Sequence, residues 1–569
     1  MTDGGQAWRR RGLVAAPPQL RARLRESGWW GDHCLLDWWR LAVRACPDRR
    51  AVIDRSGTSF TYAEADELSS RFATWLAGRG IGRGDIVGVE LPNWSEFLPV
   101  LIGVTKVGAT IAPLSPNLRR SEVLYATRLC ESRVLVLPAV YRRTDFRGLP
   151  EELRAAGSPA EAFLFVSAGD AARPEDPRLA DLLADVEPMP AQRWTPSSGD
   201  DVAAVLFTSG SEAQPKGVML THNNLIASEA SFAYALRVGP DDAMFMPAPL
   251  GHATGFMHGV VMPILARAAS VLCDSTEGRD MAPLIGRYRV TCGMSVPAVI
   301  DALLCMCRGS GEGLETVRFL CCGGSPVPRR LLQQAHELGI RLYSVYGATE
   351  SAPHTMTTFL DSDERVLHTD GCACPGTEIR IVDPATRRVL PPGVQGEEAS
   401  RGPAVFSGYL GRPDLTAKVL DGDGWYYSGD LGILDEDGYV RITGRIKDLI
   451  IRGGENISPA EVENVLLGHP DIAAAAVIGV PDDVLGQRAL AFLVARGDRP
   501  HLDVAGLREW FADCGIAKFK IPEYVEYLPE MPLTSSGKID KVALRRMVQE
   551  LREEKAALER RASGARPRA

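Results

Sequence analysis

The stretch from Leu206 to His222 holds small polar residues and a lysine in a pattern suited to binding phosphate. Its candidate ligands are Thr208, Ser209, Gly210, Ser211 and Lys216. An apolar run over residues 202–207 precedes them and predicts a buried strand. Backbone amides, small hydroxyls and one ammonium in a tight loop are groups that hold a polyphosphate. The stretch therefore predicts a site for ATP, with a Ser/Gly-rich surface turn as the alternative.

The order of these residues excludes two common kinds of nucleotide site. A Walker loop that starts at Gly210 needs a second glycine where Pro215 stands, and Lys216 does not follow a glycine. No G-x-G-x-x-G motif opens a helix after a strand, so the Rossmann fingerprint is missing as well. Residues 215–217 are expected to turn the chain toward a helix-like segment.

Further segments carry groups that could complete a nucleotide site. They span residues 344–350, 426–431, 444–448 and 533–541. The first ends a strand-like run with an aromatic, a hydroxyl and a carboxylate, and the second places Asp430 after a glycine turn. The third is rich in charge, and the fourth carries Lys538 on a Ser/Gly loop. Taken alone, the four segments could equally hold, in turn, a core tyrosine, a turn aspartate, a helix ion pair and a surface lysine. Their presence together, in this order, favours one nucleotide site.

Strand-like and helix-like segments alternate from Leu35 onward, which predicts an α/β fold that positions these residues. A new αβ pattern begins after residue 448, so the 569 residues are expected to form more than one domain. The predicted organisation is a loosely ordered N-terminal extension (1–34), a large N-terminal domain (35–446), a small C-terminal domain (447–548) and a charged tail (549–569).

Composition limits the classes of partner. The net charge of −8 gives no general attraction to nucleic acid, and no apolar stretch has the length of a membrane span. The arginine-rich N-terminus lacks a signal-peptide core, which predicts a cytoplasmic protein. None of the 12 cysteines forms a C-x-x-C pair, and neither G-x-S-x-G nor H-E-x-x-H occurs. Reduced, mostly buried thiols are expected, and the usual hydrolase and zinc-enzyme signatures are absent.

These segments together resemble the signature set of the adenylate-forming (ANL) superfamily, over about residues 35–548. With residues 249–256 (Pro-Leu-Gly-His-Ala-Thr-Gly-Phe) and 451–458 (Ile-Arg-Gly-Gly-Glu-Asn-Ile-Ser), the chain is most similar to AMP-dependent acyl-CoA synthetases for short- or medium-chain fatty, aryl or alicyclic acids. The resemblance implies a large N-terminal domain of α/β subdomains with a β-barrel-like part, and a small mobile α+β C-terminal domain.

The resemblance also implies two half-reactions. A carboxylate attacks the α-phosphate of ATP to give an acyl-AMP and pyrophosphate, and the thiol of coenzyme A then displaces AMP. Because an anion must approach a polyanion, fixed cations and donors lower the barrier of the first step. ATP and Mg²⁺, coenzyme A as co-substrate, a small carboxylic acid and a possible homodimer are the implied cofactors and partners.

Catalytic and nucleotide-binding roles are carried over position by position. The catalytic set is Lys538, Glu350 (the Mg²⁺ ligand), Thr208 and His252. The ATP and AMP set is Thr208, Ser209, Gly210, Ser211, Lys216, Gly323, Gly324, Ser325, Pro326, Tyr346, Gly347, Thr349, Asp430 and Arg445. Lys447 matches the hinge about which the small domain rotates, and Gly453 and Gly454 match the segment that lines the thiol tunnel.

The acid pocket is matched less specifically. Its candidate residues are His252, Gly255, Phe256, Met294, Ser295, Val296 and Gly323. Small residues such as Gly255 could leave room for a ring or a medium chain, and tight backbone packing is the alternative explanation. No aspartate stands ready for an α-amino group, which disfavours an ordinary amino-acid adenylation domain.

Two positions depart from the family's phosphate loop, where Glu212 replaces a hydroxyl residue and Ala213 replaces a glycine. Three alternatives to a CoA ligase stay open on the sequence. The chain could load a carrier protein, or it could activate nitrite with ATP for diazotisation of an aryl amine. A non-catalytic nucleotide-binding homologue is the third, and the presence of Lys538 and Glu350 argues against it.

Overall fold

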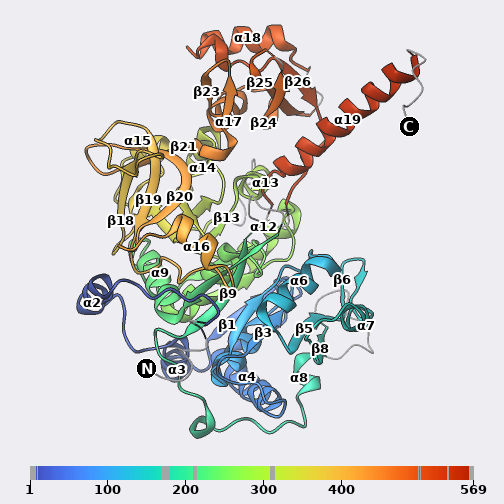
Figure 1. Cartoon of the computed structure of the whole chain (residues 1–569). Helices are drawn as coiled ribbons and strands as arrows, with labels where there is room; N and C mark the ends of the chain where they lie inside the picture. Colours follow the sequence, from blue (N-terminus) through green and yellow to red (C-terminus); the bar gives the residue numbers. More distant parts are fainter. Residues whose placement is uncertain are drawn as a thin grey trace. The chain divides into compact units, whose positions relative to one another are not determined.

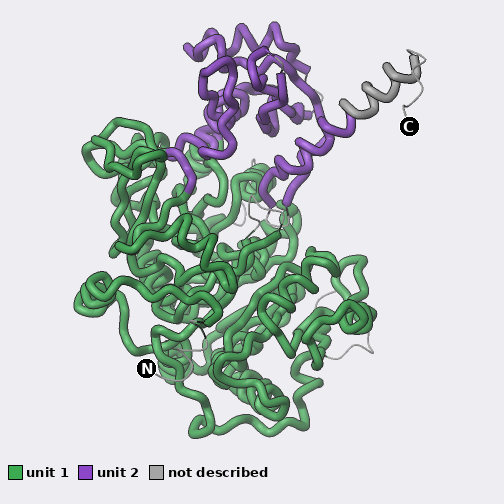
Figure 2. Tube along the Cα trace, viewed as in Figure 1, with its two compact units in different colours: residues 1–327, 331–428, 432–441 green, residues 328–330, 429–431, 442–569 purple. Residues whose placement is uncertain are grey.

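The computed structural model describes residues 8, 10–167, 178–208, 214–307, 314–482, 484–497, 499, 501–534 and 537–562, with the backbone alone beyond 551. The chain divides into two compact units (Figure 2). Unit 1 comprises residues 1–327, 331–428 and 432–441, and unit 2 comprises residues 328–330, 429–431 and 442–569. Within the described part of the chain, none of the helices combines the length and apolar character that a membrane span requires.

A six-stranded sheet forms one layer of unit 1 (Figure 1). In spatial order it contains β10 (Lys216–Thr221), β9 (Val202–Thr208), β4 (Thr110–Pro113), β3 (Ile86–Val89), β5 (Val134–Pro138) and β8 (Ala162–Val166). The pairs from β9 to β8 are parallel, whereas β10 and β9 form an antiparallel hairpin. Every residue of β3 is buried, as expected for a parallel strand covered on both faces.

A nine-stranded sheet forms the second layer. In spatial order it contains β17 (Cys372–Ala373), β16 (Ala352–Met356), β15 (Arg341–Ala348), β14 (Phe319–Gly323), β13 (Cys292–Ser295), β11 (Ala243–Met246), β12 (Ala269–Leu272), β1 (Arg50–Asp54) and β2 (Ser59–Thr61). Its central strands, from β15 to β1, run parallel. Ligands bind to parallel sheets beyond the carboxyl ends of the strands, so a ligand site is expected at the loops after β11, β13, β14 and β15.

Helices connect and cover these strands. They include α3 (Leu35–Ala45), α4 (Tyr62–Ala77), α5 (Phe97–Lys106), α6 (Arg120–Cys130), α7 (Leu149–Ala155), α8 (Leu179–Leu182), α9 (His222–Ala235), α10 (Ala253–Phe256), α11 (Met262–Ala266), α12 (Gly278–Arg287), α13 (Pro297–Cys307), α14 (Arg329–Glu337), α15 (Asp363–His368) and α16 (Pro413–Val419). The largest hydrophobic cluster joins α3, α4 and α5 to strands of both sheets, with Trp39, Phe72 and Phe97 fully buried. This shared core fixes the two sheets relative to each other.

A third sheet has the order β18 (Glu378–Val382), β19 (Gly396–Arg401), β20 (Tyr426–Leu434) and β21 (Val440–Arg445). Residues 429–431 of β20 and 442–445 of β21 are assigned to unit 2, and the rest of the sheet to unit 1. The β-barrel-like part that the resemblance implied for the large domain stays a prediction. Strands β6 (Val140–Tyr141) and β7 (Thr144–Asp145) form a separate two-stranded sheet.

Unit 2 is built on a five-stranded sheet with its own core. Its strands are β22 (Ile450–Arg452), β23 (Glu455–Ile457), β24 (Ile472–Asp482), β25 (Gly486–Ala495) and β26 (Tyr524–Tyr527), and its helices are α17 (Pro459–Leu467), α18 (Val504–Asp513) and α19 (Lys541–Ala562). Val462, Val477 and Phe511 are fully buried between sheet and helices. The continuous C-terminal part of the unit begins at Ile442, a few residues before the boundary expected after 446.

The N-terminal segment differs from the loosely ordered extension expected over residues 1–34. Pro18–Glu26 forms helix α2, and Leu24 and Trp30 are buried in a hydrophobic cluster. The indole Nε1 of Trp30 donates to the carbonyl of Pro403 at 3.0 Å. Residues 18–26 form a helix with a buried side because Leu20 and Leu24 stand at helical spacing among the arginines, and composition alone conceals that spacing.

Candidate active site

The predicted phosphate loop joins two antiparallel strands. The register pairs Thr208, the last residue of β9, with Lys216, the first residue of β10. Ser209, Gly210, Ser211, Glu212 and Ala213 lie outside the described residues, so their expected contacts stay predictions. The segment after Lys216 is a strand and not the expected helix-like segment, and α9 begins only at His222. A strand–loop–strand hairpin agrees with the exclusion of Walker and Rossmann loops, which lead into helices.

Three polar side chains meet at the end of this hairpin. Lys216 Nζ lies 3.8 Å from Glu350 Oε1, and the Glu350 side chain is only 9% exposed. Thr208 Oγ1 is buried and has no hydrogen-bond partner among the described residues. A buried hydroxyl without a partner is costly unless a ligand pairs with it. One hydroxyl, one ammonium and one carboxylate fit a magnesium-bound phosphate group.

Glu350 is held by a tight strand hairpin. Strands β15 and β16 are antiparallel, and Ala348 pairs with Ala352, so that Thr349 and Glu350 stand at the tip. The backbone N–H of Phe406 donates to the Glu350 carbonyl at 2.7 Å. The adjacent Gly347 has no space for a side chain, because a Cβ there would lie 2.1 Å from the Ala352 carbonyl oxygen. The close approach of β15 and β16 therefore fixes Glu350 at the tip of their hairpin.

The residues predicted to bind adenine follow two neighbouring parallel strands. Gly323 ends β14 and pairs with Val345 on β15, one residue before Tyr346. Gly324, Ser325 and Pro326 are exposed beyond the end of β14. The Tyr346 ring meets His354 edge-to-face, with centroids 4.8 Å apart. An aromatic face beside an exposed loop at the carboxyl edge suits a planar base.

Two buried residues, His354 and Glu398, hold Tyr346 in place. Its hydroxyl donates to Glu398 Oε2 at 3.3 Å, and His354 Nε2 lies 3.3 Å from Glu398 Oε1. Both His354 and Glu398 are almost wholly excluded from solvent. Neither residue belongs to a local motif in the sequence, so their role as supports becomes visible only in the fold.

The loop that carries His252 follows β11 and begins α10. His252 caps α10, and its Nδ1 accepts from the N–H of Thr254 at 3.4 Å. A Cβ on Gly251 would lie 2.4 Å from the backbone N of Ser115, and one on Gly255 would lie 2.1 Å from the carbonyl oxygen of Pro249. These glycines are required by close backbone contact, which favours tight packing over extra room for the acid.

Asn93 anchors this loop. It follows β3, is 4% exposed, and its Nδ2 donates to the carbonyls of Met246, Ala248 and Cys273 at 3.1, 2.9 and 3.0 Å. Its Oδ1 accepts from the N–H of Leu250 at 3.1 Å. One amide from the six-stranded sheet thus binds the carboxyl ends of two strands of the other sheet. Sequence reasoning missed this residue, although its place just after the apolar run over residues 86–91 was a usable signal.

The other apolar residues predicted for the pocket are divided between two hydrophobic clusters of the core. Phe256 packs edge-to-face against Phe97 with centroids 6.3 Å apart, and Met294 lies in the same core cluster. Val296 lies in the second cluster, with Val299 and neighbouring side chains of α13. Ser295 is buried at the end of β13. Their assignment to the acid pocket stays a prediction.

The helix after His252 contains a π-helical turn. Residues Met257–Val261 form this turn between α10 and α11. His258 Nδ1 lies 2.8 Å from Glu229 Oε2, and the ring of Phe232 stacks on the imidazole at 4.4 Å. Such turns often occur at functional sites. Nothing in the sequence indicated the turn, because helical periodicity does not report a change of hydrogen-bond register.

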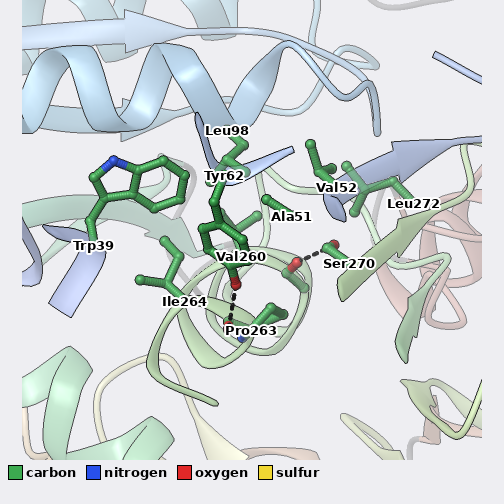
Figure 3. Close-up of a pocket in the computed structure, with 11 residues that line it drawn as sticks. Trp39, Ala51, Val52, Tyr62, Leu98, Val260, Pro263, Ile264, Ser270 and Leu272 are labelled. Carbon is green, nitrogen blue, oxygen red and sulfur yellow. Dashed lines mark hydrogen bonds between the residues drawn. The ribbon is translucent and has the colours of Figure 1, made fainter. Parts of the chain in front are cut away.

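An apolar cavity lies beside this π-helical turn but away from the polar residues above (Figure 3). Trp39, Tyr62, Val260 and Ile264 line it. The Tyr62 hydroxyl is satisfied by the carbonyl of Ala268 at 2.9 Å. The other hydroxyl in the lining, that of Ser270, donates to the carbonyl of Gly259 at 2.5 Å. Because the rest of the lining is apolar and both hydroxyls are paired, the cavity belongs to the packing of the core.

Unit 2 carries the remaining predicted residues. Arg445 Nε lies 2.9 Å from Asp430 Oδ1, and Asp430 is 6% exposed. Lys447 is exposed on a 3₁₀ turn over Ile446–Asp448. Gly453 and Gly454 form the tip of the β22–β23 hairpin. Their φ angles of 57° and 92° are ones that residues other than glycine rarely adopt.

The loop of Lys538 is closed by its own backbone. The N–H of Thr534 donates to the Lys538 carbonyl at 2.7 Å, and the N–H of Lys538 donates to Thr534 Oγ1 at 3.2 Å. Leu533 and Ile539 form a bridge at its base. The backbone of Lys538 is therefore fixed by two hydrogen bonds to Thr534, a suitable support for a side chain that must be presented to a ligand.

Family models match both units. The model of the AMP-binding enzyme matches residues 39–410, and that of the AMP-binding enzyme C-terminal domain matches residues 461–538. The chain belongs to the AMP-binding enzyme family. The adenylate-forming resemblance of the sequence is thereby confirmed, and so is the α/β fold class with a large N-terminal and a smaller C-terminal domain.

Relatives of this AMP-binding enzyme include several acid–CoA ligases. The medium-chain fatty-acid–CoA ligase of Escherichia coli K12 is 41% identical over 540 residues, which cover 93% of both chains. A feruloyl-CoA synthase of Amycolatopsis is 34% identical over 512 residues, with 90% of this chain and 98% of the relative covered.

Solved structures resemble about nine-tenths of the chain. ATP-bound MatB of Rhodopseudomonas palustris has a TM-score of 0.81 and 28% identity, covering 91% of this chain and 99% of its own. The o-succinylbenzoate CoA synthetase of Bacillus subtilis, in complex with its acyl-adenylate intermediate, has a TM-score of 0.76 and 26% identity, covering 90% and 97%.

Proposed function

We propose that this chain is an AMP-forming acid–CoA ligase that acts on an apolar carboxylic acid, with medium-chain fatty acids as the leading substrates. ATP, Mg²⁺ and coenzyme A are its co-reactants. Family membership and the acid–CoA ligases among the relatives support the reaction class. The 41% identity to a medium-chain ligase supports the acid class. A homodimer and a cytoplasmic location stay predictions from the sequence.

The single observation that carries the proposal is the polar cluster at the end of the β9–β10 hairpin. Thr208 Oγ1 is buried without a partner among the described residues, and Lys216 and Glu350 stand beside each other. We assign Thr208 and Lys216 to the phosphates of ATP and Glu350 to the Mg²⁺ ion. Bound there, the ion would neutralise phosphate charge, and the side chains would orient the α-phosphate toward the acid.

The residues of unit 2 would complete the reaction. Asp430, oriented by Arg445, is assigned to the ribose hydroxyls, because a fixed carboxylate accepts from both. Lys538 is assigned to the reacting carboxylate and phosphate, where its ammonium offsets the repulsion between two anions. Lys447 is the proposed hinge, and the Gly453–Gly454 tip is the proposed wall of the thiol tunnel. These assignments follow the family resemblance.

A paired product assay tests the proposal. The purified chain is supplied with MgATP, coenzyme A and acids from hexanoate to dodecanoate, ferulate and an alicyclic acid, and products are identified by mass. A second reaction contains MgATP, nitrite and an aryl amine without coenzyme A. We expect an acyl-CoA and one AMP per turnover in the first reaction. A diazo product in the second, with no thioester in the first, would overturn the proposal.

A further inference from the structure

Tyr409 lies between the two charged groups of the proposed phosphate site. Lys216 Nζ donates to its hydroxyl oxygen at 3.0 Å, and the hydroxyl donates to Glu350 Oε1 at 2.7 Å. The Lys216 ammonium also lies 4.3 Å from the centroid of the Tyr409 ring. The direct distance between Lys216 Nζ and Glu350 Oε1 is longer, at 3.8 Å. The hydroxyl therefore links a cation and an anion that do not themselves form a short bond.

The direction of these bonds follows from the groups themselves. An ammonium can only donate a hydrogen bond, and a carboxylate can only accept one. The Tyr409 hydroxyl between them therefore accepts from Lys216 and donates its own hydrogen to Glu350. Hydrogen bonds to charged partners are stronger than neutral ones, so this chain of bonds holds both side chains firmly.

The backbone around Tyr409 is bound on both sides. On one side it follows β10: the N–H of Met219 donates to Gly408 and that of Leu410 donates to Gly217, at 3.0 and 2.8 Å. On the other side the N-terminal segment joins it, with the N–H of Val14 donating to Ser407 at 2.8 Å. Tyr409 is 1% exposed, and its ring packs against Phe406. The position of the hydroxyl is thus imposed by the fold.

We propose that Tyr409 is a positioning residue that keeps Lys216 and Glu350 separated and directed toward a magnesium-bound phosphate. This role rests on the proposed function of the site. Without the hydroxyl, opposite charges 3.8 Å apart in a buried setting attract each other strongly. Lys216 would then move onto Glu350, and each would lose the orientation in which it can meet a ligand. Tyr409 thus acts through these two residues and does not itself contact a reacting atom.

Tyr409→Phe tests this role, because it removes one oxygen and keeps the ring beside Lys216. Tyr62→Phe is the matched control, since Tyr62 is also 1% exposed and its hydroxyl is hydrogen-bonded elsewhere in unit 1. Calorimetry without acid or coenzyme A gives the dissociation constant of ATP at several Mg²⁺ concentrations. We expect about a ten-fold or larger weakening for Tyr409→Phe, with a higher Mg²⁺ requirement, and no change for Tyr62→Phe.

Lys216→Arg provides a second test that does not depend on the stability of the first variant. It keeps the positive charge, but a longer and planar group can reach Glu350 past the hydroxyl. We expect weaker MgATP binding for this variant too. Wild-type affinity and Mg²⁺ dependence in folded Tyr409→Phe, or wild-type affinity in Lys216→Arg, would overturn the role of Tyr409. A wild-type chain that binds no MgATP would instead overturn the proposed function.

Discussion

Asn93→Asp is expected to weaken the anchor of the His252 loop while leaving the size of the side chain unchanged. The wild-type amide donates to three carbonyls at 2.9–3.1 Å and accepts from Leu250 at 3.1 Å. The introduced carboxyl keeps the acceptor for Leu250 but turns an oxygen toward the three carbonyls. A buried carbonyl that loses its donor costs about 1–3 kcal/mol. This cost applies to the carbonyls of Ala248 and Cys273, because the Met246 carbonyl still accepts from the N–H of Cys273. A loss of about 3–6 kcal/mol in the free energy of unfolding follows, with repulsion included.

The loss is expected to depend on pH. The carbonyl oxygens oppose the charged form of the introduced carboxyl, so folding should raise its pKa above the unfolded value. The variant is then least destabilised below the unfolded pKa and most destabilised above the raised folded pKa. Urea unfolding followed by the fluorescence of unit 1 at about pH 5 and about pH 8 measures this difference.

The kinetic assay separates a loop anchor from a general support of the core. Because Asn93 holds the loop before His252, the KM for the acid should rise more than the KM for ATP. Leu101→Val serves as a control, since Leu101 is 2% exposed in the same core, lies on α5 and makes no side-chain hydrogen bond. Equal destabilisation at both pH values, with the two KM values changed in proportion, would refute the role of Asn93 as an anchor.

Three further perturbations test other residues of the chain. Lys538→Ala should lower acyl-AMP formation at least about a hundred-fold yet spare thiol transfer from supplied acyl-AMP; equal loss of both activities contradicts its role. Lys447→Pro should slow thioester formation more than pyrophosphate exchange, and the reverse order rejects the hinge. Burial, with Asp54 nearby, raises the pKa of Glu96 from 4.5 to about 7. Protonated Glu96 is therefore compatible with the folded state at low pH, and the free energy of unfolding falls as the pH rises to about 7 and Glu96 loses its proton. Glu96→Gln should therefore raise the melting temperature at about pH 8 but not at about pH 4, and a pH-independent change argues against this cause.

Local chemistry made part of the site predictable from the sequence. The apolar run before Thr208 predicted strand β9, and the hydroxyls and Lys216 after it predicted a phosphate site. Asp430 and Arg445 were assigned together and form an ion pair in unit 2. These features depend on neighbours in sequence or on a recognisable set of motifs, so no tertiary information was needed.

Long-range contacts explain what the sequence left out. Tyr409 binds Lys216 and Glu350, which are 193 and 59 positions away, and Asn93 binds carbonyls 153 or more positions away. The sequence around a tyrosine or an asparagine does not indicate partners that are so distant along the chain. Gly255 shows an alternative that the sequence left open, between room for the acid and tight backbone packing. The carbonyl of Pro249, which occupies the place of a side chain, favours tight packing.

Acid-dependent exchange of labelled pyrophosphate into ATP, in the absence of coenzyme A, tests the central claim most directly. An enzyme that forms an acyl-AMP reversibly must incorporate the label only when a suitable acid is present. We predict exchange with a medium-chain acid, loss of exchange in Lys538→Ala, and AMP as the nucleotide product once coenzyme A is added. Release of ADP and phosphate, or exchange that does not depend on any acid, would contradict the claim.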